Sequence, residues 1–298
     1  GIDGNGQTEL VYGLTGLEKT MVNPEKLKTG ECMAQFFAIF MIPEKDREKY
    51  STPVPEDEAY IAALRQILVN TKDIVLTHKA AELAENEKQR KLSAFLTLED
   101  GRAVQGSLEK LERFYAMGIR LISLTWNGAN CFGFPNSPNP QHMQLGLTDF
   151  GKDAVRRMNE LGMLVDVSHL SDGGFWDVAE ISRKPFIASH SNCRSLSPHP
   201  RNLTEEMLRA LADRGGVAGL NFCPAFLDGD IHSRDSRACQ IARQARYMAN
   251  CGGVECVALG SDFDGIEGKL EIDGPDKLHL LWDALKKEGF REDDIERI

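Results

Sequence analysis

The chain has 298 residues, of which 42% are hydrophobic and 27% are charged. Its 35 lysines and arginines and 45 aspartates and glutamates leave a formal net charge of −10, which disfavours a generally basic surface and therefore nucleic-acid binding. Since no run of about 18 apolar residues occurs, the sequence predicts no transmembrane segment.

A β-rich segment followed by an amphipathic helical segment recurs along the chain, which predicts a parallel α/β fold. The opening residues 1–3 are interpreted as the end of a first strand, and seven more strands are expected. Eight βα units predict one (β/α)₈ TIM barrel domain over residues 1–298, which we expect to lack the start of its first strand and its final helix. The seven further strands are expected at Phe36–Ile42, Ser93–Leu98, Arg120–Thr125, Met163–Ser168, Pro185–Ser189, Val217–Asn221 and Cys256–Gly260.

Helices between these strands carry clear start and stop signals. Thr148 or Asp149 is expected to cap a helix that Gly162 ends. Thr204 is expected to cap a second helix, whose first turn is acidic and therefore suits the helix dipole.

Two segments interrupt this alternation. The charged stretch Pro55–Gln89 is interpreted as long helices on the outside of the barrel. The loop Asn127–Gln144 is rich in proline and glycine, and a long loop after a barrel strand predicts a pocket rim or lid.

Cysteine usage and the first residues bear on the cellular location. Seven cysteines are dispersed without a CxxC pair, which favours free thiols over a disulfide framework or a cysteine zinc site. The opening residues show no basic segment followed by an apolar one, so no secretory signal is predicted. We therefore expect a cytoplasmic protein, an expectation that a leader removed upstream would reverse.

Acidic and imidazole side chains follow four of the expected strands at their carboxyl ends, where parallel barrels carry their active sites. They are Glu99, His169, His190 and Asp262. His169 and His190 are 21 residues apart, which is one βα unit and predicts neighbouring strands. Each residue alone has a structural explanation, a hydrogen-bonded buried histidine or a helix cap. Together, a carboxylate and two imidazoles predict a site for Zn²⁺ or a similar divalent metal with open positions for water.

Asp262 and Arg201 extend this predicted site. A metal lowers the pKa of its water, and Asp262 is placed to take the proton and pass it to a leaving amine. Asp264 is the competing candidate, ranked lower because its position beside Gly265 suits a loop or cap. Arg201 is the candidate for binding a substrate carboxylate, since a guanidinium donates two parallel hydrogen bonds; an ordinary surface arginine is the alternative.

Five blocks of the sequence resemble the membrane (renal-type) dipeptidases, a family of amidohydrolase-like (β/α)₈ barrels. They stand in the family's order: AQFFAIF, GIRLISLTWNGAN, GLTDFGKDAVRRMNELGMLVDVSHLSD, PFIASHSNCRSLSPHPRNLT and VALGSDFDG. The resemblance implies a zinc hydrolase of dipeptides with two metal ions, and it suggests a homodimer. Glu99 would bridge the metals, with His169 and His190 completing one metal site. Asp262 would be the catalytic acid and Arg201 the ligand of the substrate carboxylate.

Two positions depart from that family's pattern. Asn5 and Gln7 stand where the family has a His-x-Asp ligand pair after the first strand. Neutral amides are poor zinc ligands, so we expect one zinc ion, or two if the degenerate site still binds. Trp126 stands where mammalian relatives have a substrate-contacting histidine, but LTWN is common in bacterial-looking relatives, and Trp126 remains a candidate substrate-binding residue.

The interpretation is therefore a zinc-dependent dipeptidase whose activity is impaired by the changes at Asn5 and Gln7. One alternative is a catalytically silent barrel that binds small peptides, which the two changes favour. The other is a related amidohydrolase acting on another amide or a lactam. Arg201 argues mildly against the latter, because a carboxylate ligand has little use without a terminal carboxylate.

Overall fold

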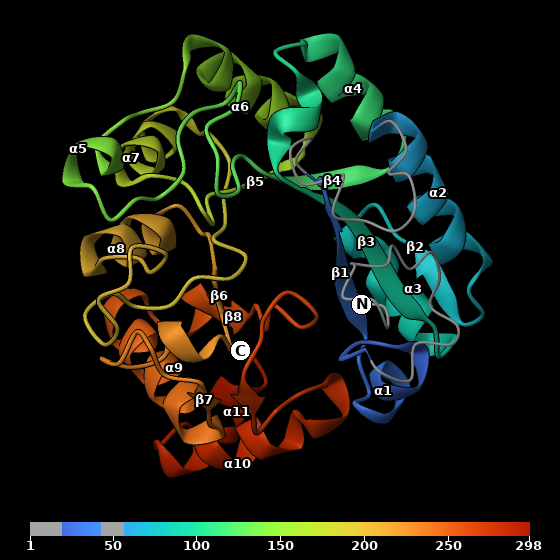
Figure 1. Ribbon diagram of the computed structural model, residues 1–298. Helices are drawn as coiled ribbons and strands as arrows, with labels where there is room; N and C mark the ends of the chain where they lie inside the picture. The colour runs from blue at the N-terminus through green and yellow to red at the C-terminus, as the bar shows by residue number, and fades with distance from the viewer. Residues whose placement is uncertain (1–19, 43–56) are drawn as a thin grey trace, which may run out of the picture.

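The computed structural model describes residues 20–42 and 57–298 of the chain. Strands lie at the inside and helices surround them, so that the elements follow one another around a ring (Figure 1). The paired strands run parallel, which confirms the α/β class expected from the alternating sequence pattern. The strand expected at the first residues lies outside the described residues, so the closure of eight strands stays a prediction.

The strands are short and their pairing is continuous over most of the chain. They are β1 (Ala34–Phe40), β2 (Ile74–Leu76), β3 (Leu92–Glu99), β4 (Ile119–Ser123), β5 (Leu164–Asp166), β6 (Ala218–Leu220), β7 (Asp235–Ser236), β8 (Val257–Leu259) and β9 (Lys269–Leu270). The largest sheet has the order β1-β3-β4-β5, with β2 paired to the first residues of β3. Parallel bridges from Asp166 to Ile187 and from Ala188 to Ala218 continue this order to the pair β6-β8.

The helices begin and end largely at the predicted caps. They are α1 (Pro24–Thr29), α2 (Asp57–Asn70), α3 (Leu83–Lys88), α4 (Leu108–Ala116), α5 (Pro140–Met143), α6 (Asp149–Leu161), α7 (Asp172–Ile181), α8 (Glu205–Asp213), α9 (Ala238–Gly252), α10 (His279–Lys287) and α11 (Glu292–Ile295). The Thr148 side chain accepts a hydrogen bond from the Gly151 amide at the start of α6, and Gly162 ends that helix with a φ of 74°. Thr204 caps α8 in the same way. Both cap predictions are confirmed.

Two sequence-based expectations need correction. The stretch Pro55–Gln89 was expected to form long helices, but over the described residues it contains α2, then strand β2, then the short α3. Asp73, at a φ of 63°, ends the preceding turn. The next residues, Ile74–Leu76, are apolar and two of them are β-branched, which favours a strand, and they pair with β3. Pro185–Ser189 was expected as a strand, and its ladder is limited to bridges at Ile187 and Ala188.

The close approach of three chain segments brings the ends of the later strands together. A Cβ atom on Gly219 or on Gly260 would lie 2.0 Å from the Ser189 carbonyl oxygen. The Cβ of either glycine would also lie 2.8 Å from the Cα of the other. Only residues without a side chain fit here, so the glycines let β6, β8 and the segment before His190 converge.

The described helices include none that is long and apolar enough to cross a membrane. Strand β3 is largely buried on both faces: the exposed fraction is zero for Leu96 and Leu98 on one face and 3% for Thr97 on the other. Glu99, at the carboxyl end of β3, is half-buried and therefore stands out as a charged exception.

Candidate metal centre

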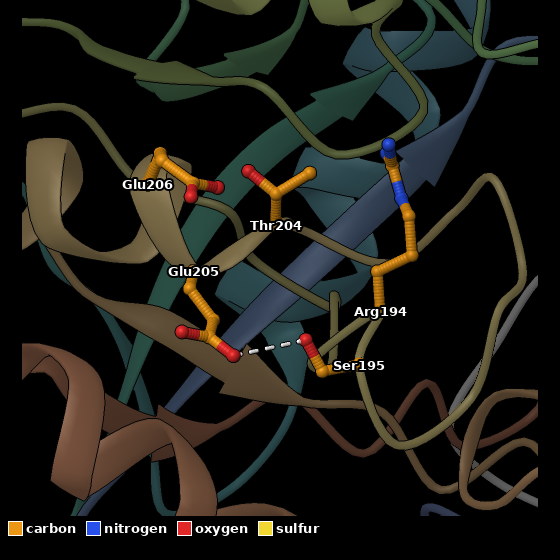
Figure 2. A pocket seen from close by; sticks show the side chains of 5 residues that line it. All are labelled: Arg194, Ser195, Thr204, Glu205 and Glu206. Atoms are coloured by element: carbon orange, nitrogen blue, oxygen red, sulfur yellow. Dashed lines mark hydrogen bonds between the residues drawn. The ribbon is translucent and has the colours of Figure 1, made fainter.

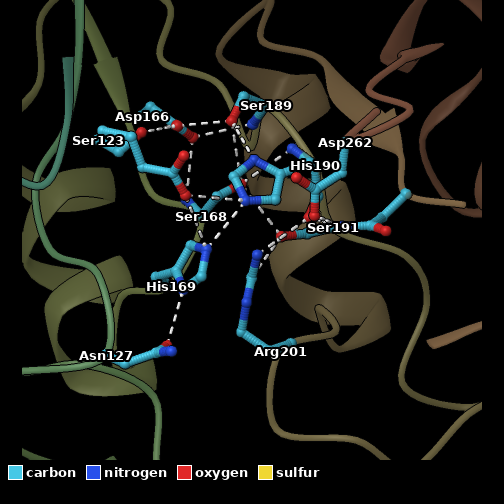
Figure 3. A network of polar contacts seen from close by, with 12 residues as sticks. Ser123, Asn127, Asp166, Ser168, His169, Ser189, His190, Ser191, Arg201 and Asp262 are labelled. Carbon is cyan, nitrogen blue, oxygen red and sulfur yellow. Dashed lines mark hydrogen bonds and ion pairs between the residues drawn. The ribbon is translucent and has the colours of Figure 1, made fainter. Parts of the chain in front are cut away.

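Three side chains converge beyond the carboxyl ends of the strands. Glu99 is the last residue of β3, His169 follows β5 by three residues, and His190 follows the bridged residues Ile187 and Ala188. One ligand atom from each of the three lies within 4.8 Å of the others. The two histidine Nε2 atoms are 2.9 Å apart, and they lie 3.3 Å (His169) and 3.7 Å (His190) from Glu99 Oε1. One ring nitrogen of each histidine points toward the other ring in Figure 3. The residues predicted from separate strands are thus brought together.

Contacts at the outer ring nitrogens direct both Nε2 atoms toward this centre. His169 Nδ1 lies 3.1 Å from Asn127 Oδ1, and His190 Nδ1 lies 2.7 Å from Ser189 Oγ. With a metal bound, an N–H at Nδ1 would donate to the Asn127 oxygen and leave the Nε2 lone pair of His169 for the metal. Two imidazole nitrogens and a carboxylate oxygen that point at one position fit a divalent metal ion, with other positions open for water and substrate.

Burial makes both imidazoles poor bases. Burial, aided by the charge of Arg201, lowers the pKa of His169 well below its ordinary value. The pKa of His190 is lowered in the same direction, again by burial first and by Arg201 second. Both rings are therefore neutral at neutral pH, the form in which histidine binds a metal.

The two aspartates after β8 have different surroundings. Asp262 lies beside His190 (Figure 3), and its Oδ2 accepts a hydrogen bond of 3.0 Å from the Asn221 side chain. Burial raises the pKa of Asp262 above its ordinary value. Asp264 is exposed and accepts hydrogen bonds from the backbone amides of Met21 (2.7 Å) and Val22 (3.0 Å). The carboxylate of Asp264 is thus used to hold a chain segment, whereas Asp262 faces the site.

Arg201 is buried beside the histidines without an acidic partner. Its guanidinium is held by two hydrogen bonds of 3.3 Å, to Ser191 Oγ and to the His190 carbonyl oxygen, and it lies 5.6 Å from the centre of the Phe226 ring. Only 7% of Arg201 is exposed, and no carboxylate of the described residues lies within 4.0 Å of it. A guanidinium has five N–H donors, so most of its capacity is left for an incoming carboxylate.

Trp126 lies at the rim of the same site. It is half-buried, its ring meets Phe40 edge-on with 4.8 Å between centroids, and its centroid is 6.4 Å from that of His169. The loop that follows Trp126 supplies Asn127 to His169, so the expected rim segment does contact the site. Asn5 and Gln7 lie outside the described residues.

The sequence-based search missed Asp166, Ser189 and Asn221. Asp166 lies inside the apolar run MLVDVS and Asn221 carries an amide, so neither matches the pattern of an acid or imidazole after the last apolar residue of a strand. The available signal was a charged residue within a buried strand, which requires satisfied partners and therefore marks a special position.

A separate pocket lies at the start of α8, away from these residues. Several of its polar side chains already have partners: Ser195 Oγ donates to Glu205 at 3.1 Å, and Arg194 makes hydrogen bonds of 2.7 Å and 2.8 Å to Asp172 outside the pocket. We assign no site to it. The pocket is lined by Arg194, Ser195, Thr204, Glu205 and Glu206 (Figure 2).

A buried carboxylate and imidazole cluster at the carboxyl ends of parallel strands is typical of metal-dependent hydrolases. The comparisons with known proteins agree. The chain belongs to the membrane dipeptidase family, peptidase family M19, whose sequence profile matches residues 9–298. The family predicted from the sequence blocks is confirmed, and with it the class of enzyme, a metallodipeptidase that uses a metal cofactor.

Individual relatives show the same family. An uncharacterized protein encoded in the 5′ region of pqqA in Klebsiella pneumoniae is 37% identical over 238 residues, which are 77% of this chain and 87% of that protein. An uncharacterized dipeptidase of Schizosaccharomyces pombe is 29% identical over 253 residues, 81% of this chain. The match spans 61% of the length of that dipeptidase.

Solved structures share the fold. The dipeptidase AC, a metallopeptidase of family M19, has a TM-score of 0.85 and 27% identity, with 96% of this chain and 88% of that chain covered. A metallopeptidase from Rhodobacter sphaeroides, liganded with a phosphinate mimic of the dipeptide L-Ala-D-Ala, has a TM-score of 0.84 and 26% identity. The match covers 96% of this chain and 89% of that one.

Proposed function

We propose that this chain hydrolyses the peptide bond of dipeptides with a divalent metal held by Glu99, His169 and His190. The observation that carries the proposal is the convergence of one carboxylate and two Nε2 atoms within 4.8 Å, beside the half-buried Asp262 and the buried Arg201. The dipeptide substrate is supported by the family and by the dipeptide mimic bound to the Rhodobacter sphaeroides metallopeptidase.

The metal we propose is one Zn²⁺ ion, because two imidazoles and a carboxylate are a ligand set that zinc prefers. When bound, such an ion lowers the pKa of a water molecule and polarises the carbonyl group of the scissile bond. A second ion would need ligands in place of Asn5 and Gln7, whose amides bind zinc weakly.

Asp262 and Arg201 have complementary roles in this proposal. Asp262 accepts the proton released by the attacking water and delivers it to the leaving amine, and Asn221 fixes the carboxyl group that does so. Arg201 binds the carboxylate at the C-terminus of the substrate, which explains a buried cation without an acidic partner. Trp126 at the rim contacts the substrate side chain. Arg201 donates to the carbonyl oxygen of His190, a proposed metal ligand, so a carboxylate bound by Arg201 would lie close to the metal, as a short peptide requires.

We also propose a single domain over residues 1–298, a cytoplasmic location and a homodimer. The location is supported by the seven free cysteines, since reduced thiols are usual in the cytoplasm. The dimer rests on family precedent, and light scattering of the purified protein tests it. A mass of one chain would contradict the dimer.

The experiment that tests the function is hydrolysis of a dipeptide panel, including L-Ala-D-Ala and L-Ala-L-Ala, by zinc-loaded protein and by the His190→Ala variant. We expect turnover by the parent protein only. Binding of dipeptides without turnover by either protein would instead favour the silent peptide-binding alternative. Replacement of Asn5→His together with Gln7→Asp then distinguishes the causes, since activity rises sharply if only a ligand pair was lost.

A further inference from the structure

Asp166, the last residue of β5, is a fully buried carboxylate with four hydrogen-bond donors around it and no cation within 4.0 Å among the described side chains. Its Oδ1 accepts from the backbone amides of Ser168 (2.9 Å) and Ser189 (2.8 Å). Its Oδ2 accepts from the hydroxyl groups of Ser123 (2.5 Å) and Ser189 (2.6 Å). Figure 3 shows Asp166, Ser123 and Ser189 above the two histidines in the view. The carboxylate therefore accepts hydrogen bonds from three neighbouring segments of the parallel fold.

The directions of these bonds follow from counting protons. The Ser189 hydroxyl has a single proton, and a carboxylate oxygen can only accept, so that proton points to Asp166 Oδ2. Toward His190 Nδ1, 2.7 Å away, Ser189 Oγ can then only accept. His190 must therefore carry its proton on Nδ1, so its Nε2 lone pair accepts the 2.9 Å hydrogen bond from His169 Nε2 in the metal-free protein and is the atom available to a metal.

We propose that Asp166 acts through Ser189 as a positioning residue, which holds His190 in the Nδ1–H tautomer and in the orientation that binds metal. The proposal rests on the proposed function, in which His190 is a metal ligand. His169 has only an exposed amide, Asn127, in the corresponding place. This buried relay, the hydrogen-bonded series Asp166–Ser189–His190, therefore makes His190 the more firmly fixed of the two imidazole ligands.

Replacement of Asp166 by asparagine should reverse the direction of the hydrogen bonds from residue 166 through Ser189 to His190. The oxygen of the new amide stays on the two backbone N–H groups, because these can only donate. The NH₂ group takes the place of Oδ2 and donates to the hydroxyl groups of Ser123 and Ser189. The Ser189 proton is then free to point to His190 Nδ1, which moves the imidazole proton to Nε2, the atom that must bind the metal.

Ser123 and Ser189 provide a matched pair of variants. Both hydroxyl groups donate to the same oxygen of Asp166, but only Ser189 touches His190. Ser123→Ala thus removes a buried hydrogen bond of the same kind while it leaves the imidazole contact in place. Ser189→Thr keeps the hydroxyl group and is the conservative rescue.

The experiment combines two readouts. Multiple-bond ¹H–¹⁵N NMR of the metal-free protein reports the His190 tautomer, and competition with a chelator of known affinity reports the dissociation constant for Zn²⁺. We expect the Nδ1–H tautomer in the parent protein, in Ser123→Ala and in Ser189→Thr. We expect the Nε2–H tautomer in Asp166→Asn, a mixture in Ser189→Ala, and zinc binding weakened by about 10- to 100-fold in both.

An unchanged tautomer and an unchanged zinc affinity in Ser189→Ala and Asp166→Asn would overturn the relay. So would an equal loss of zinc affinity in Ser123→Ala, since the effect would then come from any lost buried hydrogen bond. If Ser189→Ala fails to fold, Asp166→Asn carries the same test, because it keeps the size of the side chain. Absence of zinc binding by the parent protein would refute the proposed function instead, and the tautomer would still decide the relay.

Discussion

Replacement of Arg201 by methionine separates the substrate-binding role of this residue from any role in stability. Arg201 is 7% exposed, and its hydrogen bonds are two contacts of 3.3 Å to Ser191 and to the His190 carbonyl group. A buried cation without a hydrogen-bonded acidic partner costs free energy in the folded protein, because its hydration is lost and the charges of Asp262 and Glu99 compensate for this only in part. Methionine fills a similar space without the charge, so we expect Arg201→Met to unfold at the same temperature as the parent protein or at a higher one.

The same change should reduce hydrolysis strongly. Truncating one partner of a buried hydrogen-bonded charge pair costs about 2 to 5 kcal/mol. If the substrate carboxylate is that partner, kcat/KM falls by roughly 30- to 5,000-fold. The decrease in kcat/KM depends on the substrate carboxylate. For a dipeptide amide, which has a neutral carboxamide in its place, kcat/KM should therefore change little. The preference of the parent enzyme for the dipeptide over its amide should disappear in Arg201→Met.

Arg194→Met is the matched control from the same loop. Arg194 already has a carboxylate partner, Asp172, through hydrogen bonds of 2.7 Å and 2.8 Å. Its removal should lower the free energy of unfolding by about 1.5 to 3 kcal/mol and leave the preference for dipeptide over amide unchanged. Steady-state kinetics on the substrate pair and thermal unfolding of both variants check these expectations. An equal loss for dipeptide and amide in Arg201→Met, or a loss of stability like that of Arg194→Met, would refute the assignment.

Three further predictions concern the aspartates, pH and strand packing. Asp262→Asn should lower kcat by about 100- to 10,000-fold with folding and zinc content intact, while Asp264→Asn should keep turnover and lose roughly 1 kcal/mol of unfolding free energy. Steady-state kinetics and urea unfolding of both variants check this, and full turnover by Asp262→Asn would remove Asp262 from the mechanism. The folded-state pKa values of His169 and His190 lie below their ordinary value of 6.5. The unfolded chain then binds more protons, so the metal-free protein should lose stability as pH falls below about 6.5, by up to about 1.4 kcal/mol per pH unit for each histidine. Urea unfolding at several pH values measures this slope, and a flat or opposite slope would contradict it. Gly219→Ala should lower stability by about 1 to 3 kcal/mol or more, because its Cβ meets the Ser189 carbonyl oxygen; thermal unfolding should show no such loss for a control at Gly128, where a Cβ meets nothing within 4 Å.

Local signals predicted the parts of this fold that depend on neighbouring residues in sequence. Helix α6 begins after Thr148 and ends before Gly162, as expected. Both signals are local: the Thr148 hydroxyl group caps the first turn, and Gly162 accepts a positive φ after the last one. The position of Glu99 at the end of β3 followed from the strand's apolar pattern and its one polar end. Strand length was less predictable: the strand was expected at Met163–Ser168, and Val167 continues its apolar pattern, yet β5 ends at Asp166.

The parts that sequence did not predict depend on tertiary contacts. Three apolar residues, Ile74–Leu76, are too short a run to predict a strand within a charged segment that predicts helix. They become a strand through their pairing with β3. Asp166 was passed over because its four donors come from three separate segments, which no local spacing reveals. The Asn221 contact that holds Asp262 likewise joins residues 41 positions apart.

Elemental analysis of zinc in the purified chain, made beside dipeptide hydrolysis on the same sample, tests directly whether this chain is a zinc-dependent dipeptidase. We expect one zinc ion per chain with turnover, and loss of both in a variant that lacks the imidazoles of His169 and His190. Two ions with turnover would show that Asn5 and Gln7, or other groups, still support a second site. A chain that holds no metal and shows no turnover after zinc is added back would contradict the proposed function.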